Sequence, residues 1–197
     1  MTDEVKEVSI QEKIILATIT CIERDGLPAT TNRSIAKEAA VNSAAINYYF
    51  SSKDILVQKV LDMTINEAFS NNWQEVLDAH KNDPYQALKE FFIITLNGAV
   101  KFPNLTKAHF MDPFLNNDYS NPALKVFSGF LNELLEKFTK LFPEEKGIQF
   151  SIVQMWSSIM SLSLIPGLFS EFTELELGNT ETHRRYIDHL FKKFFNK

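Results

Sequence analysis

The chain has 197 residues, of which 45% are hydrophobic, and its 20 Lys and Arg against 25 Asp and Glu give a net charge of −5. The apolar content is sufficient to form a hydrophobic core, which excludes a disordered chain. The negative net charge argues against broad, sequence-independent binding of nucleic acid. A single cysteine, Cys21, excludes an intrachain disulfide, and no apolar run is long enough to span a membrane. The N-terminus also lacks a signal-peptide core, so we expect a cytoplasmic protein.

Apolar residues recur at steps of three and four along the whole chain, which predicts an all-α fold. Ser9 and Glu12 form a capping-box pattern for a first helix that runs to about Arg24, and Asp25-Gly26 ends it.

The stretch from Thr31 to Leu56 predicts two short helices joined by a tight turn and followed at once by a third helix. Thr31 is a good N-cap for the first, and Asn42 or Ser43 can cap the second, which spans about Ala44 to Tyr49. Ser51 and Asp54 are spaced as a capping box for a helix from Lys53. A short second helix held across a first is the helix-turn-helix arrangement that reads a DNA major groove.

The run from Lys13 to Leu56 resembles the N-terminal domain of the TetR (tetracycline-repressor-like) family of bacterial transcription regulators, without a gap over roughly a quarter of the chain. Two residues depart from the family pattern: Ala40 replaces the usual turn glycine, and Asn47 stands where a tyrosine is frequent. The positions that carry the resemblance are Ile14, Ala17, Gly26, Ala29-Thr30-Thr31, Ile35-Ala36, Ala39, Val41, Ile46, Tyr49-Phe50, Ser52-Lys53 and Leu56.

The rest of the chain predicts further helices, with a helix-turn-helix domain at 1–56 and an effector-binding and dimerisation domain at 57–197. The helix from Lys53 continues to Asn71 or, with a bend, to His80. The later helices are expected after Asp83-Pro84, over about Leu105–Met111 before a loop at Asp112-Pro113, after Asn121-Pro122, from Pro143-Glu144 to about Leu164, where Pro166-Gly167 ends it, and over about Thr180–Asn196.

A double-stranded, palindromic DNA operator is the partner that the helix-turn-helix favours. Asn47 can bond an adenine edge, and Ala44 or Ala45 can pack on a thymine methyl, while Thr31, Arg33, Tyr49 and Lys53 suit phosphates. The candidate DNA contacts are Thr31, Arg33, Ser43, Ala44, Ala45, Asn47, Tyr48, Tyr49 and Lys53. For Tyr48 and Tyr49, simple packing within the domain is the competing interpretation.

Seventeen phenylalanines are many for a chain of this size. They favour a pocket for a small hydrophobic or aromatic effector, although each taken alone is more often an ordinary core residue. The candidate ligand contacts are Phe91, Phe92, Thr95, His109, Phe110, Phe114, Phe127, Phe130, Leu134, Met155 and Trp156.

Two apolar C-terminal helices predict a homodimer whose copies bury them together in a four-helix interface. The candidate interface residues are Ile152, Ile159, Ile187, Leu190, Phe191 and Phe194. The resemblance implies a repressor that an apolar ligand releases from DNA by shifting the helix that joins the domains.

No metal-ligand spacing, phosphate-binding loop or nucleophile motif occurs, so the sequence predicts neither an enzyme nor a cofactor or metal site. Two rival interpretations stay open: a ligand-independent regulator whose solid second domain binds a protein partner, and a helical lipid or small-molecule carrier that no longer binds DNA.

Overall fold

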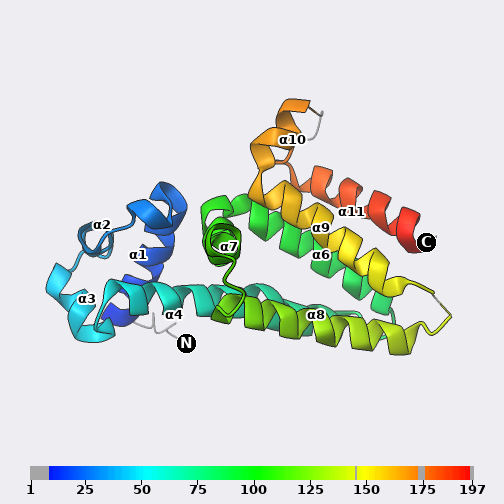
Figure 1. Ribbon diagram of the computed structural model, residues 1–197, viewed down its shortest axis with the longest axis horizontal. Helices are drawn as coiled ribbons and strands as arrows, with labels where there is room; N and C mark the ends of the chain where they lie inside the picture. The colour runs from blue at the N-terminus through cyan, green and yellow to red at the C-terminus, as the bar shows by residue number, and fades with distance from the viewer. Residues whose placement is uncertain (1–8, 145, 173–175, 196–197) are drawn as a thin grey trace, which may run out of the picture.

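The computed structural model describes residues 9–144, 146–172 and 176–195, and throughout these ranges the regular structure is helical. The all-α prediction is therefore confirmed. The molecule is elongated, with a small N-terminal bundle at one end, a larger helical bundle at the other, and α4 running from one into the other (Figure 1). No described helix is both long and apolar enough to cross a membrane.

The N-terminal bundle follows the predicted capping pattern with one correction. Ser9 and Glu12 form the predicted capping box, and Thr31 and Asn42 each accept a hydrogen bond from the helix they precede. The cap of α4 is Ser52 rather than Ser51, because Ser51 has a positive φ of 66° and ends α3. The elements are α1 (Ile10–Asp25), the 3₁₀ turn η1 (Leu27–Ala29), α2 (Asn32–Glu38), α3 (Ser43–Phe50) and α4 (Lys53–Asn66).

The helix that starts at Lys53 continues beyond α4 through a π-helical turn, η2 (Glu67–Asn71), into α5 (Asn72–Ala79). This agrees with the predicted long helix that reaches His80. A π-helical turn inserts an extra residue into the helix, so the side chains after Glu67 face a different direction from those before it.

The second bundle differs from the predicted boundaries in three places. The helix predicted at 105–111 extends to Asn116 through Pro113, because α7 packs against α1, α4, α6, α8 and α9, and this packing outweighs one missing hydrogen bond. The penultimate long helix begins at Ile148, after Gly147 in the left-handed conformation, instead of near Glu144. Pro166 also opens a short helix that was not predicted. The elements are α6 (Pro84–Lys101), α7 (Pro103–Asn116), α8 (Pro122–Leu141), α9 (Ile148–Leu164), α10 (Pro166–Phe172) and α11 (Thr180–Phe195).

Two hydrophobic cores stabilise the molecule, and they separate within α4 between Leu61 and Ile65. The N-terminal core includes Leu105 and Ala108 of α7, so this helix belongs to both bundles. The boundary at residue 56 stays a prediction.

Candidate nucleic-acid interface and ligand pocket

The N-terminal bundle holds α2 and α3 by a few buried side chains and leaves the outer side of α3 uncovered. Ile35 and Ile46 are fully buried, and Phe50 is 5% exposed. The turn between the two helices passes through Ala40 at φ 54°. Ala40 occupies the position of the usual turn glycine, and the left-handed conformation costs an alanine about 1 kcal/mol relative to glycine.

The exposed side of α3 carries most of the predicted base-reading residues. Ser43, Ala44 and Asn47 are exposed, and Tyr48 is 82% exposed with its ring edge-on to Tyr49 at 4.9 Å. Ala45, in contrast, is half-buried and packs against the N-terminal core. The structure therefore brings a short polar and aromatic surface together on one helix.

The predicted phosphate-binding residues surround α3 and differ in how free they are. Arg33 and Thr31 are exposed, but the Thr31 hydroxyl caps α2 by accepting a hydrogen bond from Ser34 N at 3.1 Å. Lys53 donates from Nζ to the Thr30 carbonyl at 3.1 Å, which ties the start of α4 to the segment before α2. Lys53 thus has a structural role in addition to the one predicted.

A partly open, mostly apolar pocket of about 360 Å³ lies in the second bundle, between α4, η2, the start of α5, α6, α7 and α9. One residue of the N-terminal bundle, Ile19 of α1, also lines it. The lining residues are Ile19, Thr64, Ile65, Glu67, Ala68, Phe69, Asn72, Ile94, Thr95, Gly98, Ala99, Phe102, Leu105, Thr106, His109, Phe110, Trp156, Ile159, Met160 and Ser163.

Of the predicted ligand contacts, the structure brings together Thr95, His109, Phe110 and Trp156 around this pocket. Most of the other candidates pack into the aromatic core beside it, where for example the rings of Phe91 and Phe130 are 5.0 Å apart. The candidates that lie outside the lining are Phe91, Phe92, Phe127, Phe130, Leu134 and Met155. The side chain of Phe114 lies outside the described residues.

Three polar side chains that line the pocket have a buried atom without a hydrogen-bond partner among the described residues: Thr95 Oγ1, His109 Nδ1 and Trp156 Nε1. The other nitrogen of His109, Nε2, lies 3.1 Å from Thr64 Oγ1. Burial lowers the pKa of His109 from 6.5 to about 4, so its imidazole is neutral near pH 7. Unpaired buried polar atoms are costly, and these three belong to residues that line one pocket.

The pocket is connected to the N-terminal bundle by the start of α7. The Glu23 carboxylate of α1 accepts a hydrogen bond from Leu105 N at 3.1 Å, and Asn104 Nδ2 donates to the Glu23 carbonyl at 2.8 Å. Because α7 also carries His109 and Phe110 of the pocket, a change in the pocket can reach α1 through one helix.

Most of the predicted dimer-interface residues lie in the core of the chain itself. Five of them are at most 8% exposed, and Phe194 is half-buried against the same core. The core-facing residues are Ile152, Ile159, Ile187, Leu190 and Phe191. The apolar residues that α9 leaves outside are Phe150, 68% exposed, and Val153, 49% exposed.

Sequence reasoning missed the pocket residues on α4, η2 and the start of α7. Thr64, Glu67, Leu105 and Thr106 carry no motif, and their position depends on how three helices pack. The one available signal was the unusual length of the helix from Lys53, which had to pass beside the second bundle.

Comparison with known proteins finds a family match for the first part of the chain. Residues 14–60 match the model of bacterial regulatory proteins of the tetR family. The chain is also 30% identical over 77 residues to the HTH-type transcriptional regulator BetI of Burkholderia ambifaria, and it resembles BetI of Burkholderia cenocepacia to the same degree. This match spans 39% of the chain and 39% of each relative.

Solved structures resemble nearly the whole chain in fold, although their sequences differ. A proposed TetR-family transcriptional regulator from Rhodococcus sp. gives a TM-score of 0.65 at 13% identity and covers 94% of this chain and 98% of its own. Thermus thermophilus FadR, a TetR-family transcriptional repressor in complex with lauroyl-CoA, gives a TM-score of 0.58 at 18% identity, with 92% and 93% covered.

Proposed function

Because residues 14–60 match the model of the tetR family, we propose that the chain is a homodimeric, DNA-binding transcriptional regulator of this family, acting as a repressor that a small ligand releases from a palindromic operator. The observation that carries this proposal is α3, which presents Asn47 and Tyr48 to solvent while Ile46 and Phe50 fix it on α2 and α4. A short helix held in this way can enter a major groove.

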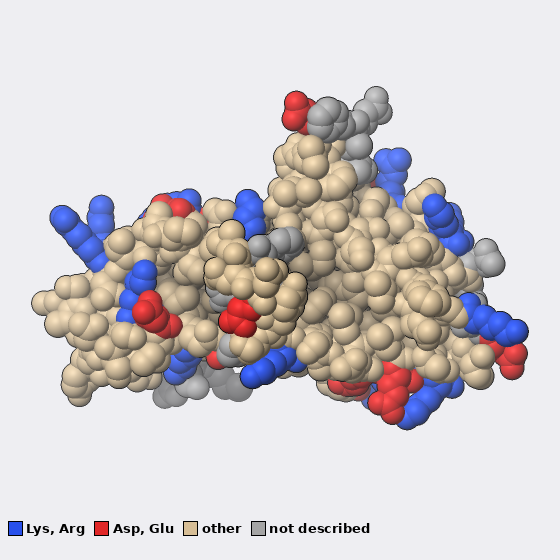
Figure 2. All heavy atoms as spheres, viewed as in Figure 1, with Lys and Arg blue, Asp and Glu red and all other residues tan. Residues whose placement is uncertain are grey.

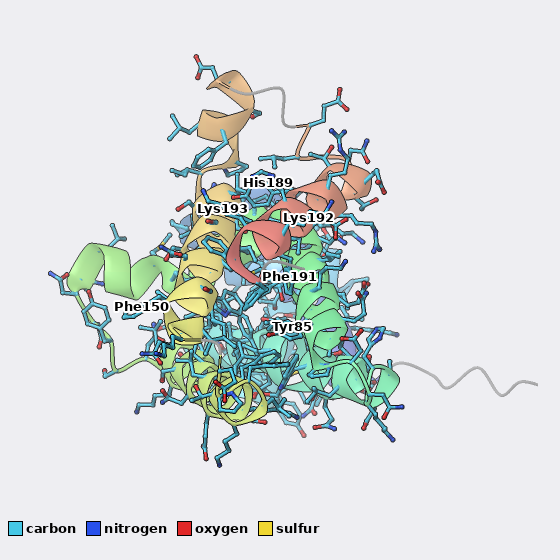
Figure 3. All side chains as sticks on the ribbon, turned by 90° about the vertical axis from the view of Figure 1, so that its right-hand side faces the viewer. Tyr85, Phe150, His189, Phe191, Lys192 and Lys193 are labelled. Atoms are coloured by element: carbon cyan, nitrogen blue, oxygen red, sulfur yellow. The ribbon has the colours of Figure 1, made fainter. Side chains whose placement is uncertain are left out.

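The surface of α9 supports a homodimer with a different interface from the one predicted. α9 contains no charged residue, and its outer side runs from Phe150 and Val153 past Ser157 and Ser161. Figure 2 shows the uncharged surface over α9, and Figure 3 shows Phe150 pointing away from the bundle while Phe191 points into it. Small serines let two such helices approach closely about a twofold axis.

An apolar groove beside α9 extends this surface. It has a volume of about 610 Å³ and lies between α7 and α9, with Met111, Leu115 and Ile165 among its lining residues. Leu115 is 71% exposed and Ile165 is 49% exposed. Exposed apolar residues gathered in one place mark an interaction site. A second copy of the chain that contributes the same side of its α9 would cover both the outer side of α9 and this groove.

The pocket in the second bundle supports regulation by a ligand over the ligand-independent alternative. It touches both α4 and α7, which connect the two bundles, and the structurally similar FadR was crystallised with lauroyl-CoA. A ligand that favours the DNA-free arrangement by about 1–3 kcal/mol lowers operator affinity accordingly.

The proposal is tested by fluorescence anisotropy with the DNA upstream of the chain's own coding region. The protein should bind a palindrome there with an affinity that falls steeply with salt. Asn47→Ala should cost about 1–3 kcal/mol of binding free energy and relax the base preference at one position of the operator. Arg33→Ala should weaken binding to all DNA sequences and reduce the slope of log affinity against log salt concentration by about 1. Arg185→Ala, on the exposed side of α11, is the control and should change nothing. Binding without sequence preference, or binding unaffected by Asn47→Ala and Arg33→Ala, would refute the proposal.

A further inference from the structure

We infer that the pocket between α4, α6, α7 and α9 selects an uncharged, compact molecule with an apolar body and a hydroxyl-like group, and that Thr95, His109 and Trp156 bind this group. The inference rests on the pocket being the effector site proposed above, and it adds the chemical class of the ligand. It follows from the polar atoms around the cavity, the charges that are absent from its wall, and its size.

The polar atoms of the wall specify both an acceptor and a donor on the ligand. Trp156 Nε1 carries a hydrogen and can only donate, so it requires an acceptor. Thr64 Oγ1 lies 2.9 Å from the Val60 carbonyl, to which it donates, and is therefore left to accept from His109 Nε2 at 3.1 Å. This arrangement leaves His109 Nδ1 as an unpaired acceptor, which requires a donor. A hydroxyl group supplies both.

The remaining polar side chains of the wall are already engaged. Ser163 Oγ donates to the Ile159 carbonyl at 2.7 Å, Thr106 Oγ1 donates to the Ala99 carbonyl at 3.3 Å, and Asn72 Nδ2 donates to the Ala68 carbonyl at 3.4 Å. The unpaired atoms thus come from three different helices, α6, α7 and α9, with one residue on each. A molecule held by all of them would connect the helices that enclose the pocket.

The charge of the wall disfavours anions. No Lys or Arg is among the lining residues, and the ionisable ones are Glu67, which is negative, and His109, which is neutral. A carboxylate or phosphate buried there would have no counter-charge and would meet Glu67 at the wall. A simple ammonium group only donates and would leave the Trp156 N–H unpaired, so the neutral class fits best. A cavity of about 360 Å³ is also near the lower end of ligand pockets, which run from about 300 to 1,000 Å³. It therefore suits a compact ring system rather than a long chain.

The inference is tested by calorimetry on the DNA-free protein with four probes: 2-naphthol, 2-methoxynaphthalene, naphthalene and 2-naphthoate, with lauroyl-CoA as a fifth, long anionic probe. We expect 2-naphthol to bind most tightly, about tenfold tighter than naphthalene, with 2-methoxynaphthalene between them. The two anions should bind more weakly than 2-naphthol. Equal binding of naphthalene and 2-naphthol, tighter binding of either anion, or no binding of 2-naphthol at millimolar concentration would overturn the inference.

The residue assignment is tested with one matched pair of variants. Thr95→Val removes an unpaired hydroxyl and should weaken 2-naphthol about three- to tenfold while leaving naphthalene unchanged. Thr106→Val makes the same change at a lining residue whose hydroxyl is already bonded, and it should leave the preference for 2-naphthol intact. Loss of that preference in Thr106→Val, or its survival in Thr95→Val, would overturn the role of Thr95.

The two tryptophans give a direct spectroscopic readout. Each indole N–H gives one resonance in a ¹H–¹⁵N spectrum, and Trp73→Phe assigns them. Trp73 Nε1 is also buried without a partner among the described residues, but Trp73 does not line this pocket. On addition of 2-naphthol the Trp156 resonance should move and the Trp73 resonance should stay, whereas an unmoved Trp156 resonance would contradict the inference. Since no DNA is present, these results are independent of whether the protein is a regulator, which the anisotropy experiment decides.

Discussion

His109 is a buried titratable residue whose protonation links pH to stability. Because burial lowers its pKa from 6.5 to about 4, the unfolded chain binds a proton at this position in the window between these values and the folded chain does not. The free energy of unfolding must therefore fall as pH is lowered from about 6.5 to 4, by up to about 3 kcal/mol from this residue.

The measurement is urea unfolding of the protein and of His109→Gln, which cannot titrate, at several pH values from 7 to 4. The protein should lose more stability than the variant across this window. The pKa of His183 is also lowered by burial, so both proteins keep a common slope, and the difference between them reports His109. Parallel curves would show that His109 is not held neutral by the fold.

At the level of single residues, the sequence did not distinguish side chains that line the pocket from side chains that fill the core. Thr95, His109 and Trp156 were chosen for their types and do line the pocket, but Phe91 and Phe130 were chosen for the same reason and pack on each other in the core. Spacing along one helix defines a buried side, and it does not say whether a cavity or another side chain meets that side.

At the level of elements, hydrogen bonds of Glu23 and Asn104 join α1 of the N-terminal bundle to the start of α7, which carries part of the pocket wall. Glu23→Ala removes an acceptor for the first amide groups of α7, which have no partner within the helix. We expect the free energy of unfolding to fall by about 1–2 kcal/mol. The amide of Leu105 should also exchange hydrogen faster.

Glu23→Gln separates the hydrogen bond from the charge, since the glutamine side chain keeps one carbonyl oxygen as an acceptor and is neutral. Its effect should be smaller than that of Glu23→Ala. Glu133→Ala on the exposed side of α8 is the control and should change neither stability nor the exchange of Leu105. If the amide of Leu105 exchanges hydrogen in Glu23→Ala at the same rate as in the unchanged protein, the Glu23 carboxylate does not hold the start of α7.

The elements themselves were predictable where a local signal starts or stops a helix. Asp83 before Pro84 and Asn121 before Pro122 begin α6 and α8 as predicted, because side-chain caps and proline at the first position act over a few residues. The end of α7 was not predictable, because the helix passes through Pro113 under the influence of packing from five other helices. The short helix α10 was not predicted either, because Pro166 was interpreted only as the end of the preceding helix.

At the level of the whole molecule, the orientation of α9 would decide how the two copies of the proposed dimer are placed on DNA. The sequence showed that α9 is apolar on two sides, and it could not say which side the chain buries itself. The structure buries Ile152 and Ile159 and exposes Phe150 and Val153. A dimer formed through the exposed side would hold the two α3 helices at a fixed distance, and a palindrome requires about 34–36 Å between its half-sites.

The prediction that follows concerns Ser157, in the middle of the exposed side of α9, whose hydroxyl donates to its own helix at the Val153 carbonyl. Ser157→Glu places a charge where, about a twofold axis, the same charge of the second copy lies nearby, and burial of both is costly. The 22.6 kDa chain should behave as a dimer in light scattering, and Ser157→Glu should shift it to monomer and abolish tight binding to a palindrome. Ser128→Glu makes the same change at an exposed serine of α8 and should remain a dimer. A monomeric unchanged chain, or a Ser157→Glu variant that dimerises as tightly as Ser128→Glu, would mean that α9 is not the interface and that its apolar side serves another partner.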